Sequence, residues 1–359
     1  MASLGTLLAT ACLISDDPYQ AGFSILRPND GVSFMFANNV SDSVIMFSFG
    51  DWVISNYDGS DNSWVALSAR QGKGGVIYGL KADFSQNTTG KSRSALFRLV
   101  DSEHPSDGNA VIGFWQYATR GDGSLGNAAD VKRITGSDGS SIELSYDVQH
   151  RPLSLRMTKD SQTLSDLSLS YNDRDSIMYV NENGIELTSY YSNDYLPAFL
   201  HSSTDTLRYS YLYYNYTPID FRYYFNYEHR RIDAVRNTCV RYKFPQSPVI
   251  SLLPDSLHCA DTLSYFKGTE LVRKLGFEYS SLDNRRQSVD VNQLILGVEE
   301  CDPYLLLSLF RYCRNTSIVS RARGENEEIT VQAEVNGNGS VAKLIVKTRD
   351  GDVTYTFDY

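Results

Sequence analysis

Residues 134–157, ITGSDGSSIELSYDVQHRPLSLRM, decide the fold that we expect for this chain. A glycine-rich turn comes first, and a second turn occupies residues 147–151. Apolar residues alternate with polar ones on both sides of the second turn: Ile142, Leu144 and Tyr146 before it, and Leu153, Leu155 and Met157 after it. Alternation with a period of two, bounded by turn residues, is typical of half-buried strands. The stretch therefore predicts a β-hairpin.

The same pattern, an alternating run of residues that ends in Tyr, recurs up to the end of the sequence. It is found at residues 167–171, 207–211, 221–227, 275–279 and 353–359. Asn-Gly and Asp-Gly turns at 336–339 and 349–352 favour hairpins because these residues accept positive φ. Each hairpin leaves an apolar face that neighbouring hairpins must cover. Residues 127–359 are thus predicted to form a repetitive antiparallel hairpin sheet.

One region of this half breaks the pattern. After Pro303, four apolar residues follow at helical spacing: Leu305, Leu306, Leu309 and Phe310. Asp302 is suited to the N-cap position and Pro303 to the first helical position. We expect one short helix at about residues 303–313 that covers the sheet.

The first half of the chain contains short alternating segments at residues 32–36, 43–49, 75–84, 94–99 and 110–117. Turn-forming residues separate them, which favours an antiparallel sandwich of about seven strands. Residues 121–127, GDGSLGN, are the clearest linker. The expected organisation is a signal remnant and tether at residues 1–18, a sandwich at 19–126 and the Tyr-rich hairpin domain at 127–359.

Several short motifs of the first half carry a family resemblance: Trp52, SWVALS at 63–68, GKGG at 72–75, Asn87, RSALF at 93–97 and IGFWQ at 112–116. In order and spacing they resemble the BACON family, over residues 22–120. The sequence departs from that pattern in its long loop at 101–109. The resemblance implies an immunoglobulin-like module of Bacteroidetes surface proteins and enzymes, associated with carbohydrate binding or with a spacer role.

The second half resembles uncharacterised β-rich domains of Bacteroidetes lipoproteins, whose hairpins are similar to the Tyr-Asp repeats of Rhs-type shells. The residues that carry this likeness are 139–147, 151–153, 277–279, 289–292 and 355–359. Rhs chains have a tighter and longer repeat, so we expect an open, strongly curved sheet. The fold class is all-β: an immunoglobulin-like sandwich followed by the hairpin sheet with its short helix.

The N-terminal residues indicate where in the cell the protein is located. Residues 4–14 are apolar but too few to span a membrane as a helix. Residues 9–12, ATAC, resemble a bacterial lipobox, and Ser15-Asp16-Asp17 resembles an acidic tether. A lipidated Cys12 would place the protein at the outer membrane, at the cell surface or in the periplasm, with membrane contact through the lipid anchor only. The alternative is a frayed apolar N-terminus with an ordinary cysteine. No basic residue precedes the apolar run, which points to a start further upstream.

Trp115 is the candidate ligand-binding residue. Ile112, Phe114 and Gln116 share one face of the expected strand, so a period of two puts Trp115 on the other face. There the indole could stack on a sugar ring, or it could pack on the neighbouring domain or on the N-terminal segment. The short linker favours packing on the neighbouring domain. Trp64, amid apolar residues, is expected in the core.

Catalytic and metal-binding motifs are absent from the sequence, and no cofactor is expected. Cys239, Cys259, Cys301 and Cys313 lack zinc-ligand spacing and leave the disulfide state open. The Asp/Asn turn at 58–62 is too isolated to indicate calcium. Five histidines are scattered: His104, His150, His201, His229 and His258.

The net charge of −10 and a pI near 5.0 argue against nonspecific nucleic-acid binding. The sequence thus predicts a lipid-anchored binding or scaffold protein, associated with polysaccharide or mucin-type glycans, and not an enzyme. A glycan-active hydrolase with an unrecognised site and a purely structural surface protein are the alternatives.

Overall fold

The computed structural model describes residues 22–28, 31–105, 109–171, 177–182, 185–191, 197–202, 207–219, 222–233, 238–243, 247–248, 259, 262–267, 269–309 and 314–359. The chain divides into two compact units, each considered by itself. The first unit, the sandwich, contains residues 22–35, 40–85 and 93–116, and the second, the barrel, contains 36–39, 86–92 and 117–359. Residues 121–127, which the sequence suggested as a linker, fold with the second unit.

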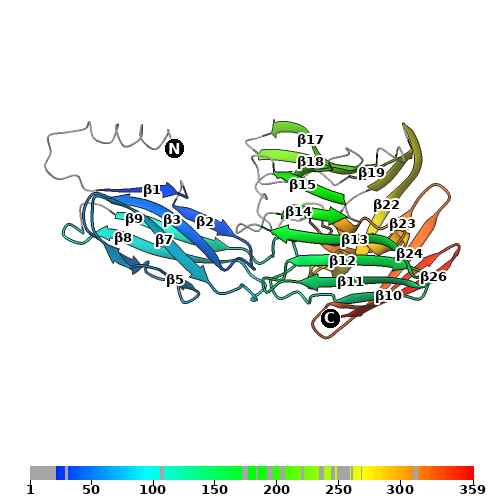
Figure 1. The fold of residues 1–359 in the computed structure, drawn as a ribbon, viewed down its shortest axis with the longest axis horizontal. Helices are drawn as coiled ribbons and strands as arrows, with labels where there is room; N and C mark the ends of the chain where they lie inside the picture. Colours follow the sequence, from blue (N-terminus) through cyan, green and yellow to red (C-terminus); the bar gives the residue numbers. More distant parts are fainter. Residues whose placement is uncertain are drawn as a thin grey trace. The chain divides into compact units, whose positions relative to one another are not determined.

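Two sheets form the sandwich (Figure 1). One sheet has the order β1-β3-β7-β5, and the other has the order β2-β9-β8-β4-β6. Their strands are β1 (Phe23–Arg27), β2 (Val32–Met35), β3 (Ser41–Ser48), β4 (Trp52–Asn56), β5 (Val65–Leu67), β6 (Gln71–Gly72), β7 (Val76–Phe84), β8 (Arg93–Asp101) and β9 (Asn109–Gln116). The five segments expected from alternation are β2, β3, β7, β8 and β9, so the all-β prediction is confirmed here. Alternation did not locate the other four strands, β1, β4, β5 and β6, each of which has five residues or fewer.

The core of the sandwich lies between the two sheets. Met46 and Leu80 come from one sheet, and Trp52, Phe97 and Phe114 come from the other; all five are fully buried. Trp64 is buried as well, as expected from its apolar neighbours. Alternate residues on these strands therefore face inward, and the remaining residues form the two outer faces.

The barrel contains one closed antiparallel sheet (Figure 1). Its described strands are β10 (Arg133–Gly136), β11 (Ser140–Tyr146), β12 (Pro152–Lys159), β13 (Gln162–Tyr171), β14 (Ile177–Glu182), β15 (Ile185–Tyr191), β16 (Pro197–Ser202), β17 (Leu207–Ile219), β18 (Arg222–Asp233), β19 (Thr238–Lys243), β20 (Ser247–Pro248), β21 (Thr262–Lys267), β22 (Glu270–Asp283), β23 (Ser317–Arg323), β24 (Glu328–Val335), β25 (Val341–Thr348) and β26 (Gly351–Asp358). The strands follow chain order, with extra pairings of β18 with β20 and of β19 with β21.

The expectation of an open sheet is wrong. Strand β10 pairs with β26 through Arg133 with Asp358, Ile134 with Phe357, Thr135 with Thr356 and Gly136 with Tyr355. Ile134, Phe357 and Tyr355 are buried on the inside. The pairing of β10 with β26 therefore gives hydrogen-bond partners to the backbone groups at two strand edges. It also extends the apolar interior.

The hairpin predicted within residues 134–157 is formed by β11 and β12. Ile142 and Leu144 face the interior, opposite Met157 and Leu155. Leu153 departs from the expectation and is exposed, because a bulge pairs Tyr146 with Pro152 and shifts the register before Ser154.

Residues 284–309 form an inserted segment between the paired strands β22 and β23. It contains the 3-10 helices η2 (Asn284–Arg286) and η3 (Val291–Leu296) and the helix α2 (Pro303–Leu306). Asp302 caps α2 by accepting from the backbone N–H of Tyr304 and Leu305, as predicted. The helix ends at Leu306 because Ser308 adopts a left-handed φ of 51°. Residues 310–313 of the predicted helix lie outside the described residues.

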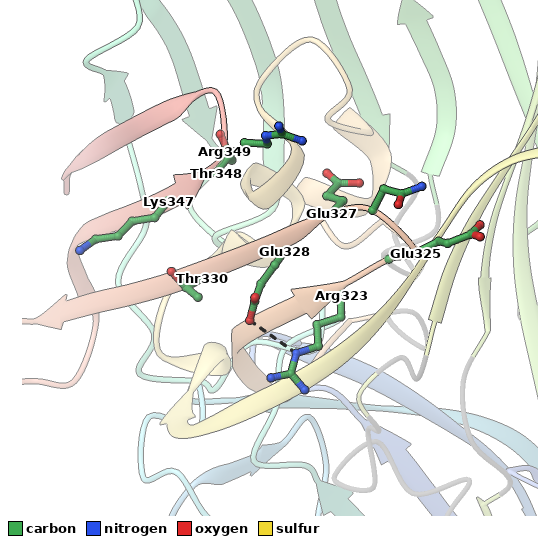
Figure 2. A pocket seen from close by; sticks show the side chains of 10 residues that line it. Arg323, Glu325, Glu327, Glu328, Thr330, Lys347, Thr348 and Arg349 are labelled. Atoms are coloured by element: carbon green, nitrogen blue, oxygen red, sulfur yellow. Dashed lines mark ion pairs between the residues drawn. The ribbon is translucent and has the colours of Figure 1, made fainter.

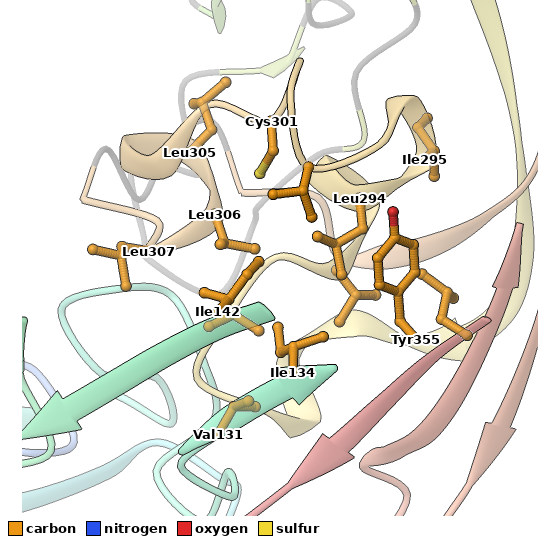
Figure 3. Packing of buried hydrophobic residues seen from close by; sticks show 14 of the residues in the cluster. Val131, Ile134, Ile142, Leu294, Ile295, Cys301, Leu305, Leu306, Leu307 and Tyr355 are labelled. Carbon is orange, nitrogen blue, oxygen red and sulfur yellow. The ribbon is translucent and has the colours of Figure 1, made fainter. Parts of the chain in front are cut away.

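The inserted segment packs on the inward-facing residues of the barrel. Figure 3 shows Leu294, Leu306 and Leu307 close to Ile134 and Ile142 of the first two barrel strands. The apolar interior is thus built from strands and insertion together. On the outer face, by contrast, ion pairs link neighbouring strands: Lys343 to Glu334 at 3.0 Å, Arg321 to Glu328 at 3.1 Å and Arg323 to Glu278 at 3.2 Å.

Candidate functional site

An aromatic pair lies on the outer face of the β2-β9-β8-β4-β6 sheet. Phe34 of β2 and Trp115 of β9 are register partners across a parallel strand pair, so both side chains point to the same side. Phe34 is 59% exposed and Trp115 is 37% exposed. Ile112 and Phe114 are fully buried on the opposite side, which confirms the face predicted for Trp115. We call the surface formed by Phe34, Val53, Val111 and Trp115 the aromatic face.

The centre of the aromatic face is flat because of a glycine. Gly113 lies on this side of β9, between Val32 of β2 and Leu96 of β8. A β-carbon at Gly113 would lie 3.0 Å from a methyl carbon of each neighbour. Val32 and Leu96 therefore close over the glycine, and no side chain rises between Trp115 and Val111.

Polar groups of β8 lie within this surface, between Trp115 and Val111 of β9 and Val53 of β4. Ser94 is the register partner of Trp115 on β8, and Arg98 is the partner of Val111. Both are exposed. A hydroxyl and a guanidinium beside an aromatic ring can bond the hydroxyl groups of a ligand that is stacked on the ring.

A partly buried polar contact lies on the other side of the sheet, at the Trp115 end of the aromatic face. The Arg93 guanidinium donates to Gln116 Oε1 from Nε at 2.9 Å and from Nη2 at 2.7 Å. The same guanidinium lies 4.4 Å from the Trp64 ring centroid. Burial lowers the pKa of Arg93, against the opposing influence of Asp61. Gln116 and Trp115 are adjacent, so these contacts hold the end of β9 that presents the indole.

A second feature is an open hollow of about 630 Å³ on the outside of the barrel, lined by residues 323–328, Thr330 and residues 347–349 (Figure 2). Glu328 pairs with Arg323 at 3.5 Å, and Glu327 pairs with Arg273. Glycoside hydrolysis needs two carboxylates facing each other across a cleft. Here ion pairs engage two of the three glutamates, which favours a structural role for them.

A third feature, buried between the inserted segment and β23, went unnoticed in the sequence. Arg314 donates to the backbone carbonyls of Asn284 at 2.8 Å and Gln287 at 2.7 Å. Asp290 accepts from the side chains of Asn284 at 2.6 Å and Asn315 at 2.9 Å. Burial raises the pKa of Asp290 and lowers that of Arg314. This network is enclosed, so it fastens the insertion and presents nothing to a ligand. A run of Asn, Gln and Asp inside an apolar stretch, residues 284–295, was its only signal.

The remaining sequence candidates are not brought together. Cys12, His258 and Cys313 lie outside the described residues, as do the side chains of Cys239, His201 and His229. Cys259 Sγ lies 3.3 Å from Thr316 Oγ1, and Cys301 is buried. His104 is exposed, and His150 Nδ1 lies 2.6 Å from Asp130 Oδ2.

In the part of the chain that the structure describes, no group of three or more His, Cys, Asp or Glu residues is arranged to hold a metal ion. The Asp/Asn turn at 58–62 bonds to itself, with Ser60 Oγ donating to Asn62 Oδ1 at 2.7 Å. No helix among the described residues is both long and apolar enough to cross a membrane.

Comparison with known proteins leaves the family open. No family model and no curated protein matches this chain. A porin-like protein from Bacteroides uniformis matches 64% of this chain and 98% of its own at 10% identity, with a TM-score of 0.39. A GH5 xyloglucanase from Bacteroides ovatus matches 30% of this chain and 21% of its own at 18% identity, with a TM-score of 0.22. The Tc holotoxin pore of Photorhabdus luminescens matches 86% and 16% at 10% identity, with a TM-score of 0.18. At these scores the function must be argued from the chain's own residues.

Proposed function

We propose that this protein is a lipid-anchored binding protein of the cell surface or periplasm and that the aromatic face binds glycans. The observation that carries the proposal is the exposed register pair of Phe34 and Trp115. Two neighbouring rings on a flat sheet face expose apolar area, which is costly in water unless a ligand covers it. The C–H faces of sugar rings stack on such side chains, and the hydroxyl groups of a sugar can bond to Ser94 and Arg98 on the neighbouring strand.

The proposed cellular location rests on the sequence around Cys12. The apolar run, the small residues before the cysteine and the acidic tether after it support lipidation. Replacing Cys12 by Ser in the native host should release the protein into the soluble fraction. Continued membrane attachment of the Cys12→Ser protein would contradict the anchor.

A glycan array with the purified protein tests the binding role, using polysaccharide and mucin-type glycans. A positive glycan class should be lost or weakened at least about fivefold in Trp115→Ala and in Phe34→Ala, since aromatic stacking contributes about 1 kcal/mol or more. Phe49→Ala is the matched control, because Phe49 is an exposed aromatic residue next to the other sheet. Its binding should equal that of wild type.

The other two functional classes predict different results. Release of shorter sugars during the incubation would indicate a hydrolase. An array with no binding at all, from a protein with a normal melting curve, would leave a structural role and refute the glycan proposal.

A further inference from the structure

Exposed apolar residues gather at one end of the sandwich, on both sides of the β1-β3-β7-β5 sheet. Phe49 is 40% exposed, Val76 is 50% exposed and Ile77 is 41% exposed. Phe47 is the register partner of Ile77 and packs edge-to-face on Phe49, with ring centroids 4.9 Å apart. We call these four residues the apolar end.

The N-terminal part of the chain joins the sandwich at the apolar end. The backbone N–H of Phe49 donates to the carbonyl of Gly22 at 3.3 Å. Phe23, the first residue of β1, pairs with Ser48, and Ser48 pairs with Val76. Gly22 lies ten positions after Cys12 in the sequence, and a fully extended chain of ten steps reaches about 35 Å at most. A lipid attached at Cys12 would therefore keep this end of the sandwich near its membrane.

The turn beside the apolar end has a fixed shape. Gly75 has a positive φ of 73°, and a β-carbon at Gly74 would lie only 2.3 Å from the carbonyl oxygen of Phe49. Asp51 accepts from the backbone N–H of Gly74 at 3.0 Å and from Lys73 Nζ at 2.5 Å. The apolar side chains are thus presented by a preorganised turn, which lowers the entropic cost of binding.

One ion pair lies next to the apolar end: the strongly exposed Lys73 pairs with Asp51, and Glu103 also acts on the Lys73 ammonium. The lysine offsets part of the repulsion between these carboxylates and an anionic surface. Phe, Val and Ile side chains beside a lysine suit the boundary between lipid head groups and acyl chains.

We propose that the apolar end rests on the lipid surface beside the anchored Cys12. This inference rests on the lipid anchor of the proposed function. It also orients the sandwich on the membrane, since the aromatic face belongs to the other sheet.

The test uses the full chain carrying Cys12→Ser, so that no lipid is attached, and vesicles of phosphatidylethanolamine and phosphatidylglycerol. In flotation, this protein should bind vesicles, and the added pair Phe49→Ser and Ile77→Ser should weaken binding at least tenfold. Residues 4–14 are present in every variant, so the difference reports the apolar end alone. Val53→Ser with Val111→Ser, on the aromatic face, is the matched control and should bind as before.

Equal flotation of the Phe49→Ser, Ile77→Ser protein would overturn the proposal, as would an absence of vesicle binding. If that pair of changes instead converts a dimer to a monomer, the apolar end is covered by a second copy and the lipid proposal fails. Val76→Glu is the second variant if the double change does not fold, and it should also lose vesicle binding. Because the assay uses unlipidated protein, its result is independent of whether Cys12 is lipidated in cells.

Discussion

Ile134 and Phe357 are register partners that join the first and last strands of the barrel, and both side chains are buried in its interior. The pair shows that closure of the sheet is a packing event as well as a hydrogen-bonding event. The strands around this seam whose side chains are described all contribute inward-facing residues to one apolar cluster. Substitutions at the seam should therefore change the stability of the whole barrel.

Tyr355, next to this seam, gives the first prediction. Its ring is fully buried, its hydroxyl has no hydrogen-bond partner among the described residues, and burial raises its pKa. Tyr355→Ala should cost about 3–5 kcal/mol of unfolding free energy, as for other large buried aromatic residues. Tyr355→Phe removes only the unpartnered hydroxyl and should leave stability equal or higher. Urea unfolding of both variants decides this; a large loss in Tyr355→Phe would mean that the hydroxyl is partnered.

Asp138 gives a prediction about pH. Its carboxylate accepts from Lys159 Nζ at 2.6 Å and from Ser140 Oγ at 2.6 Å. Burial raises the pKa of Asp138, but these hydrogen bonds outweigh burial and hold the pKa below its usual value. The ionised group therefore stabilises the fold above the unfolded-state pKa, and the contribution is lost as pH falls through the lower folded-state pKa.

Asp138→Asn should accordingly cost about 1–2 kcal/mol at pH 7, and the difference from wild type should shrink steadily below pH 4. Chemical unfolding at several pH values measures it. Glu325→Gln, at an exposed position, is the control and should show no such dependence. A cost for Asp138→Asn that persists unchanged at pH 2–3 would show that charge is not its cause.

The buried network predicts a strong coupling between Arg314 and Asp290. Arg314→Met leaves backbone carbonyls without their donor and Asp290 without its compensating charge, which should cost about 3–5 kcal/mol. Asp290→Asn should also destabilise, but less in the Arg314→Met background than alone. A double-mutant cycle from urea unfolding checks this, and strictly additive losses would show that the two groups act independently.

The sandwich should fold by itself. It has its own core of buried residues from both sheets, and residues 19–120 contain all nine of its strands. A fragment of these residues should therefore give a cooperative melting transition. A fragment without such a transition would show that its core depends on the rest of the chain.

Local sequence patterns predicted the elements well. Alternation located β11 and β12, and Asp302 with Pro303 located the start of α2, because these features depend on neighbours in the chain. Leu153 and the end of α2 were mispredicted, because a bulge and the left-handed Ser308 depend on backbone geometry that residue types leave open.

Long-range features could not be predicted in the same way. Thr135 and Thr356 lie on paired strands although they are 221 residues apart, and nothing local marks them as partners. The aromatic face was only half predicted: Trp115 was singled out by its strand, whereas Phe34 joins it through a parallel pairing that no turn signals. The Arg314 network was missed because isolated polar residues resemble loop residues until their partners are known.

The pairing of β10 with β26 also sets an order of events during synthesis. The seam cannot form until the eight-residue strand β26 has left the ribosome, so the barrel stays open until then. Until then β10 offers an unpaired edge to any other extended chain. A polypeptide that ends before β26 would keep that edge permanently, and cells should remove such products by proteolysis or accumulate them as aggregates.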